Sequence, residues 1–172
     1  YAGRYRIRTG NRYFSIENFM NLDATAIRNL ELVRNMRDGS KRGTLLDVLD
    51  FTNTSMGARK LRSWIECPLL DLGKIYERQD AVAELLDNTT LREAVVERLK
   101  AIYDLERIVS RLEVGSANAR DLVSLRTSLA VLPEVKAVLA NCKSRKLQKI
   151  YNNLHVHEDI YSALEAAIVD EP

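Results

Sequence analysis

The side chains that most often carry out chemistry in proteins are few in this sequence and poorly spaced for it. His155 and His157 form a His-x-His pair near an expected helix boundary, with no Cys or third His nearby. Structural zinc usually takes four protein ligands, so surface or packing histidines are favoured over a metal site. Cys67 and Cys142 stand 142 − 67 = 75 positions apart and form no Cys-x-x-Cys. Reduced thiols in a cytoplasmic protein are the simplest prediction.

Nucleotide-binding and nucleophilic signatures do not stand out either. None of the seven glycines opens a Gly-x-Gly-x-x-Gly, and the one Gly-Lys pair, Gly73-Lys74, is followed by Ile75 instead of Ser or Thr. There is no His-Glu-x-x-His, and no Ser, Cys or Thr has a local pattern of activation. The residues alone therefore predict a scaffold and not an enzyme, with no catalytic, cofactor-binding or metal-binding residue.

A basic, tyrosine-rich stretch at the N-terminus is the one candidate for binding a polyanion. Arginine and tyrosine alternate there without an acid, which suits phosphate contacts and base stacking. The candidate DNA-binding residues are Arg4, Arg6, Arg8 and Arg12. A cut strand or linker with solvated charges is favoured, because so few contacts give little affinity. Residues 43–172 hold 17 basic and 20 acidic side chains, a net charge of −3, which disfavours a DNA-binding surface there.

The elements that must position any site are helical from Thr44 onward. Apolar residues recur at three- and four-residue spacings, as in Leu105, Ile108 and Leu112, and capping residues precede them. Thr90-Leu91-Arg92-Glu93 has the pattern of a capping box. Pro133 predicts a kink or a new first turn. The expected helices are 24–30, one starting at 44, 54–66, 71–86, 90–99, 104–114, one starting at 118 or 121, and two more at about 144–154 and 158–169.

The expected fold class is mostly α: an irregular multi-helix bundle with a short β or irregular N-terminal lead-in. Tyr13–Ile16 is aromatic and β-branched enough for a short strand. We expect residues 1–22 to be the lead-in and 23–172 a single helical domain. Each helix has one apolar face, so the helices must pack on one another. The expected structural core includes Leu61, Trp64, Ile65, Leu105, Ile108, Leu122, Leu125 and Leu129.

Length and composition agree with a packed domain. The chain has 172 residues, of which 46% are hydrophobic and 29% charged. No apolar run approaches the roughly 20 residues of a membrane span, so we expect no membrane association. The chain begins with Tyr and has no signal segment, which predicts a fragment of a longer protein.

Two long stretches carry a resemblance. The first contains LDATAIRNLEL (residues 22–32) and continues through TLLDVLDFTNTSMGARKLRSWI (44–65) to Pro68-Leu69. The second is DLERI (104–108) with Arg111-Leu112 and the RDL at 120–122. Over about residues 17–172, the chain resembles the core region of the MutS family of DNA mismatch repair proteins.

That resemblance implies a role for the chain within a larger machine. Proteins of this family are dimers that clamp mismatched double-stranded DNA, change state with ATP and magnesium, and work with a MutL-type partner. This chain resembles the N-terminal part of their helical core, ending before the clamp, and residues 1–22 would end a connector region. The core links the mismatch-reading and clamp regions to the ATPase. The candidates for ion pairs between domains or within this core are Arg59, Arg62, Arg107, Arg111 and Arg126, and the alternative for each is an ordinary surface charge.

The family's own functional residues have no counterparts here. The mismatch-reading Phe-x-Glu is absent, since Phe14, Phe19 and Phe51 are followed two positions later by Ile16, Asn21 and Asn53. The phosphate-binding loop is absent as well. We therefore expect no catalysis by this chain and weak or no DNA binding on its own. The alternatives are a free-standing helical adaptor that binds a partner helix, and a nucleic-acid binder with a basic tail.

Overall fold

The computed structural model describes residues 6–9, 12–15 and 18–169, with the backbone alone described for 6–9 and 12–15. The chain forms two compact units. The first comprises residues 1–52 and 58–76, and the second comprises 53–57 and 77–172. This division differs from the single helical domain over residues 23–172 that is expected from the sequence. Each unit is described by itself.

The first unit begins with a β-hairpin. Strand β1 (Arg6–Thr9) pairs antiparallel with β2 (Arg12–Ser15), in a register that sets Arg6 opposite Ser15. A second short pairing follows, because the Met20 amide donates to the Pro68 carbonyl and the Leu70 amide to the Asn18 carbonyl. The expected short β lead-in is therefore confirmed, and the expected strand at 13–16 corresponds to β2.

Three helices complete the first unit: α1 (Ala24–Asn29), α2 (Leu45–Leu49) and most of α3 (Ser55–Glu66). Asp23 caps α1 by accepting the Ala26 amide at 2.6 Å, and Thr44 caps α2 by accepting the Asp47 amide at 3.1 Å. The small core consists of Val33, Leu46 and Ile65, with partly buried apolar side chains around them. This small core brings together side chains from the segment after α1, from α2 and from α3.

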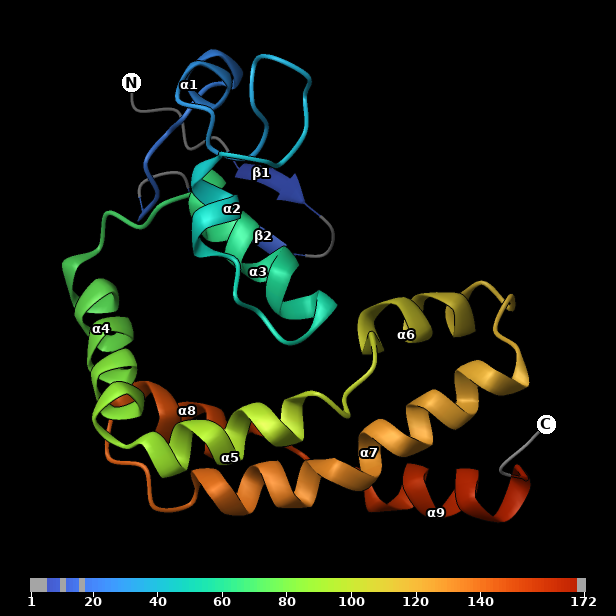
Figure 1. Cartoon of the computed structure of the whole chain (residues 1–172). Coiled ribbons are helices and arrows are strands. Elements are labelled where there is room, and N and C mark those ends of the chain that lie inside the picture. Colours follow the sequence, from blue (N-terminus) through green and yellow to red (C-terminus); the bar gives the residue numbers. More distant parts are fainter. Residues whose placement is uncertain (1–5, 10–11, 16–17, 170–172) are drawn as a thin grey trace. The chain divides into compact units, whose positions relative to one another are not determined.

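The second unit is helical throughout its described part. Its helices are most of α4 (Leu72–Asp87), then α5 (Thr89–Leu99), α6 (Leu105–Glu113), α7 (Ala119–Leu139), α8 (Arg145–Asn153) and α9 (Glu158–Ala167). Helix α7 is the longest, and α5, α6, α8 and α9 all contact it (Figure 1). The buried residues Ala81, Val135, Leu139 and Leu147 join α4, α7 and α8 into one core. The mostly helical fold class predicted from the sequence is confirmed.

The sequence signals for helix ends are mostly confirmed. Asp104 caps α6, and Asn118 forms a capping box with Asp121 at the start of α7. Gly115 follows α6 with φ of 68°, the left-handed conformation that favours glycine. The capping box predicted at Thr90 is wrong, because Asn88 is the cap of α5 and accepts the Leu91 amide at 3.0 Å. Helix α4 ends at Asp87, so the single residue Asn88 separates it from α5.

None of the helices that the structure describes is both long enough and apolar enough to cross a bilayer.

Candidate functional site: polar joints around helix α7

The predicted core residues are only partly buried together. Ile65, Ile108 and Leu129 are buried, and Leu61, Leu105, Leu122 and Leu125 are half-buried. The prediction that Trp64 is a core residue is wrong, because 36% of its surface is exposed. Leu61 and Ile65 lie one turn apart and face the core of the first unit, whereas Trp64 is rotated about 100° from Ile65 around the helix.

The other candidate residues are not brought into a site. Arg6 and Arg8 lie on β1 and Arg12 on β2, while Arg4 lies outside the described residues, so their DNA binding stays a prediction. His155 and His157 are exposed, and their ring centres are 6.1 Å apart. Among the described residues, no group of three or more His, Cys, Asp or Glu side chains could hold a metal ion.

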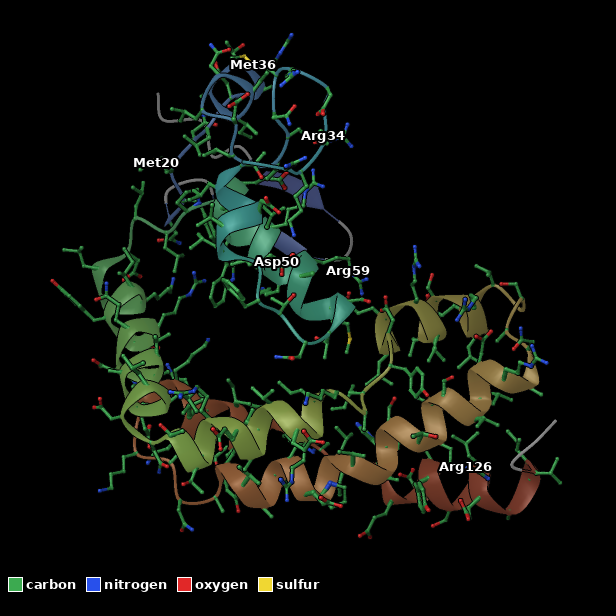
Figure 2. All side chains as sticks on the ribbon, viewed as in Figure 1. Met20, Arg34, Met36, Asp50, Arg59 and Arg126 are labelled. Atoms are coloured by element: carbon green, nitrogen blue, oxygen red, sulfur yellow. The ribbon has the colours of Figure 1, made fainter. Side chains whose placement is uncertain are left out.

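Polar side chains that join separate helices do gather around α7. At its N-terminal half, Arg111 of α6 pairs with Asp121 at 2.5 Å. Arg126 is buried, donates to the Ile168 carbonyl at the end of α9 at 2.9 Å and lies 3.5 Å from Glu165 (Figure 2). These contacts hold α6 and α9 against the same stretch of α7, and we call such polar side-chain contacts between helices polar joints.

Ser128 is the most enclosed polar residue of this group, with an exposed fraction of 0%. Its hydroxyl accepts the Tyr103 amide at 3.0 Å and donates to the Ser124 carbonyl at 2.8 Å. Tyr103 belongs to the short connection between α5 and α6. One buried hydroxyl therefore fixes that connection on α7.

The C-terminal half of α7 is joined to different helices. Glu134 lies 3.3 Å from Arg98 of α5. Lys136 donates to the Leu154 carbonyl at 2.8 Å, and its ammonium lies 5.4 Å from the centre of the Tyr151 ring. Pro133 lies between the two sets of joints and has no amide hydrogen, so the helix continues through it without the bond to the Leu129 carbonyl.

Two carboxylates on α4 hold the start of α8. Glu84 accepts the Lys143 amide at 2.6 Å and the Ser144 amide at 2.7 Å, which supplies the cap that the Ser144 side chain does not. These hydrogen bonds lower the pKa of Glu84. Glu77 pairs with Lys149 at 3.0 Å and with Arg145 at 3.3 Å, and the Lys149 bond lowers the pKa of Glu77. Both carboxylates are therefore favoured in their charged form.

Sequence reasoning anticipated some of these joints. Of the candidate ion-pairing arginines, Arg111 and Arg126 make the cross-helix pairs described above, and Arg62 pairs with Glu66 at 3.0 Å within α3. Arg107 makes no ion pair with any described residue. Ser128 and Glu84 were missed, because their partners lie 25 and about 60 positions away and no local pattern marks them.

The arrangement around α7 defines a class of protein domain. It is a mostly helical scaffold in which polar joints hold a long central helix against its neighbours, and its chemistry is that of structural hydrogen bonds and ion pairs. The family described as MutS domain III matches residues 25–172. The chain belongs to the MutS family, and the resemblance found in the sequence is confirmed.

Curated relatives give the same result. The chain is 44% identical over 161 residues to the DNA mismatch repair protein MutS of Clostridium kluyveri, an alignment that covers 94% of this chain and 18% of that protein. It is 46% identical over 159 residues to that of Exiguobacterium sp., covering 92% and 19%. It is 47% identical over 155 residues to that of Symbiobacterium thermophilum, covering 90% and 18%. The chain thus spans about a fifth of the length of these relatives.

Proposed function

We propose that this chain is the N-terminal part of the helical core of a DNA mismatch repair protein. In that role it links the mismatch-reading and clamp regions to the ATPase and passes conformational change between them. The family membership supports this proposal over a free-standing adaptor. Its partners in the larger protein are mismatched DNA, a second subunit and a MutL-type protein, and ATP and magnesium bind outside these residues.

The observation that carries the mechanical role is the set of joints on α7. A packed helix transmits a displacement when its neighbours are fixed to it at discrete points. Arg126 fixes the end of α9, and Ser128 fixes the connection between α5 and α6, within one turn of the same helix. A movement of α7 is therefore passed to both.

The test uses the mismatch repair protein that carries this domain. We expect Ser128→Ala to reduce the effect of a mismatched duplex on ATP turnover several-fold while leaving turnover without DNA near that of the parent protein. Ser110→Ala, at an exposed position on α6, is the matched control. Equal mismatch responses in the parent and the Ser128→Ala protein, measured at a temperature at which both are folded, would contradict the relay.

The isolated chain tests the other half of the proposal. We expect no ATP turnover, and DNA affinity no better than the non-specific range of about 10⁻⁴–10⁻⁶ M at physiological salt. Titration of labelled duplexes, with and without a mispair and at two salt concentrations, measures this. If all four N-terminal arginines touched phosphates, the salt slope would reach about −3.6. Tight, mismatch-selective binding would show that this part of the core contacts DNA directly.

A further inference from the structure

The connection between α1 and α2 is a basic loop that the proposed function does not use. We define the basic loop as residues 34–42, which contain Arg34, Arg37, Lys41 and Arg42 but only one acid, Asp38. Lys41 is engaged by Asp50 at 2.5 Å. The three arginines are exposed and form no ion pair with any residue that the structure describes. The loop therefore offers guanidinium groups that the unit itself leaves uncompensated.

The base of the loop is fixed to the core of the first unit. Val33, just before the loop, is buried with Leu46 and Ile65. The Leu46 amide donates to the Leu32 carbonyl at 2.9 Å, so the two arms of the connection are held together. Glu31 adopts φ of 46°, and its carboxylate accepts the Met36 amide at 2.6 Å. The two ends of the loop are thus held in fixed positions on the first unit.

One side chain organises the interior of the loop. The Asn35 carbonyl oxygen accepts the amides of Asp38 and Gly39 at 2.9 and 3.1 Å. Its amide nitrogen donates to the Ser40 hydroxyl at 3.1 Å and to the Arg42 carbonyl at 3.0 Å. The Asn35 backbone amide also donates to the Ser40 carbonyl at 2.9 Å. All four hydrogen-bonding positions of this side chain are used to close the loop on itself.

An apolar side chain accompanies the arginines on the surface of the loop. Met36 is 58% exposed, and Figure 2 shows it and Arg34 on the loop. Arginine and methionine are both enriched in protein–protein interfaces, and methionine adapts its shape to a partner. A pre-ordered loop also loses little conformational entropy on binding. A fixed shape, arginines that pair with no acid in the described part of the chain, and an exposed methionine are together the properties of a docking surface.

We propose that the basic loop binds an acidic protein segment that carries an apolar side chain among its carboxylates. Guanidinium groups pair with carboxylates through two parallel hydrogen bonds, which matches Arg34, Arg37 and Arg42 to Asp and Glu side chains. The apolar side chain of the partner covers Met36. Nucleic acid fits less well, because three phosphate contacts give little affinity and Met36 would have no apolar counterpart. This proposal does not depend on the relay through α7.

The test uses the chain with an array of short synthetic peptides in which the number of Asp and Glu residues and the presence of one Leu are varied independently. We expect binding to rise with the number of acids and to rise further when Leu lies among them. The strongest peptide is then titrated in solution by fluorescence anisotropy, with a duplex DNA of the same label as competitor. Because the number of acids and the presence of Leu are varied independently, the array shows which of the two properties the loop requires.

Two variants and a matched control connect binding to the loop. We expect R34E/R42E to weaken binding of the strongest peptide by about tenfold or more, since each lost charge pair at an interface contributes appreciably. M36S should remove the preference for Leu and leave the preference for acids. The control, K60E/R120E, makes the same change in net charge at exposed positions on α3 and α7 and should bind as the parent does.

Several outcomes overturn the proposal. Binding to no peptide of the array excludes the docking surface. Equal losses in R34E/R42E and K60E/R120E show only a response to net charge. Tighter binding of the duplex DNA than of the strongest peptide, lost in R34E/R42E, assigns the loop to nucleic acid. Circular dichroism and thermal unfolding of each variant establish that a loss of binding is not a loss of fold.

Discussion

Among the described residues, Thr44 in the first unit and Ser128 in the second are almost completely buried, and their hydroxyl groups bond over different sequence distances. Thr44 of the first unit is 1% exposed, donates to the Lys41 carbonyl at 2.6 Å and accepts the Asp47 amide, all within three residues. Ser128 of the second unit is 0% exposed and accepts the amide of Tyr103, 25 residues away. The same functional group closes a local turn in one unit and joins distant segments in the other.

A similar difference separates the side-chain contacts of the loop before α2 from those of helix α4. The side-chain bonds of that loop span at most nine residues, as in those of Asn35 and the pair of Lys41 with Asp50. In the second unit, Glu77 and Glu84 reach partners about 60 to 72 residues away. The side-chain contacts around the loop of the first unit therefore fix the shape of that loop. Those of Glu77 and Glu84 in the second unit fix α4 and α8 relative to each other.

The largest expected effect comes from a cavity in the second unit. Leu139 is 5% exposed in the core formed by α4, α7 and α8. Leu139→Ala should lower the free energy of unfolding by about 2–5 kcal/mol through lost transfer energy and the cavity left behind. Hydrogen exchange should show lost protection on α4 and α8 as well as on α7. Val114→Ala, at a position 74% exposed, is the control and should change little.

The two buried hydroxyls give the next largest effects. Ser128→Ala should cost about 1–3 kcal/mol, because the Tyr103 amide is left without its partner in a buried place. Thr44→Ala removes a helix cap and should cost about 0.5–2 kcal/mol. Chemical denaturation measures both. Hydrogen exchange of the Tyr103 amide should accelerate in Ser128→Ala, whereas in Thr44→Ala the faster exchange should stay within a few residues of position 44. Faster exchange at residues distant in sequence from Thr44 would contradict the difference between the two hydroxyls.

The cap from α4 to α8 should make the second unit sensitive to acid. Hydrogen bonds from Ser144 and from the Lys143 amide lower the pKa of Glu84 below its ordinary 4.5. Its stabilisation is therefore complete above that ordinary value and is lost as the pH falls through the lowered value. Glu84→Gln keeps one acceptor oxygen and should cost about 1 kcal/mol at neutral pH. The variant should also lose less stability than the parent as the solution is acidified.

The smallest effect is expected at the ion pair of the first unit. The hydrogen bond from Lys41 lowers the pKa of Asp50 from 3.8 to about 2. Its contribution is complete above pH 3.8 and disappears as the pH falls to about 2. Lys41 is 43% exposed, so Lys41→Met should cost no more than about 1 kcal/mol. Titration of the Asp50 carboxyl by NMR should show its pKa rise in the variant.

What the sequence predicts well is what depends on neighbouring residues. Apolar stripes and caps such as Asp23, Asp104 and Asn118 define the helices, because the groups they satisfy lie within one turn. Trp64 was predicted to be a core residue because it is apolar and precedes Ile65. Only the face of α3 that carries Leu61 and Ile65 is turned to the core, and Trp64 lies off that face. The joints at Ser128 and Glu84 could not be predicted, since their partners become neighbours only when the helices pack. The division into two units was missed for the same reason.

Pro133 gives α7 uneven stiffness. Because the Leu129 carbonyl has no amide partner at Pro133, the resistance of the helix to bending is lowest at that turn. The joints at Asp121, Arg126 and Ser128 lie before this turn, and those at Glu134 and Lys136 lie after it. We therefore expect a force applied through α9 to bend α7 at this turn. As a result, a smaller displacement would reach the contacts of α7 with α5 and α8 than the displacement at α9.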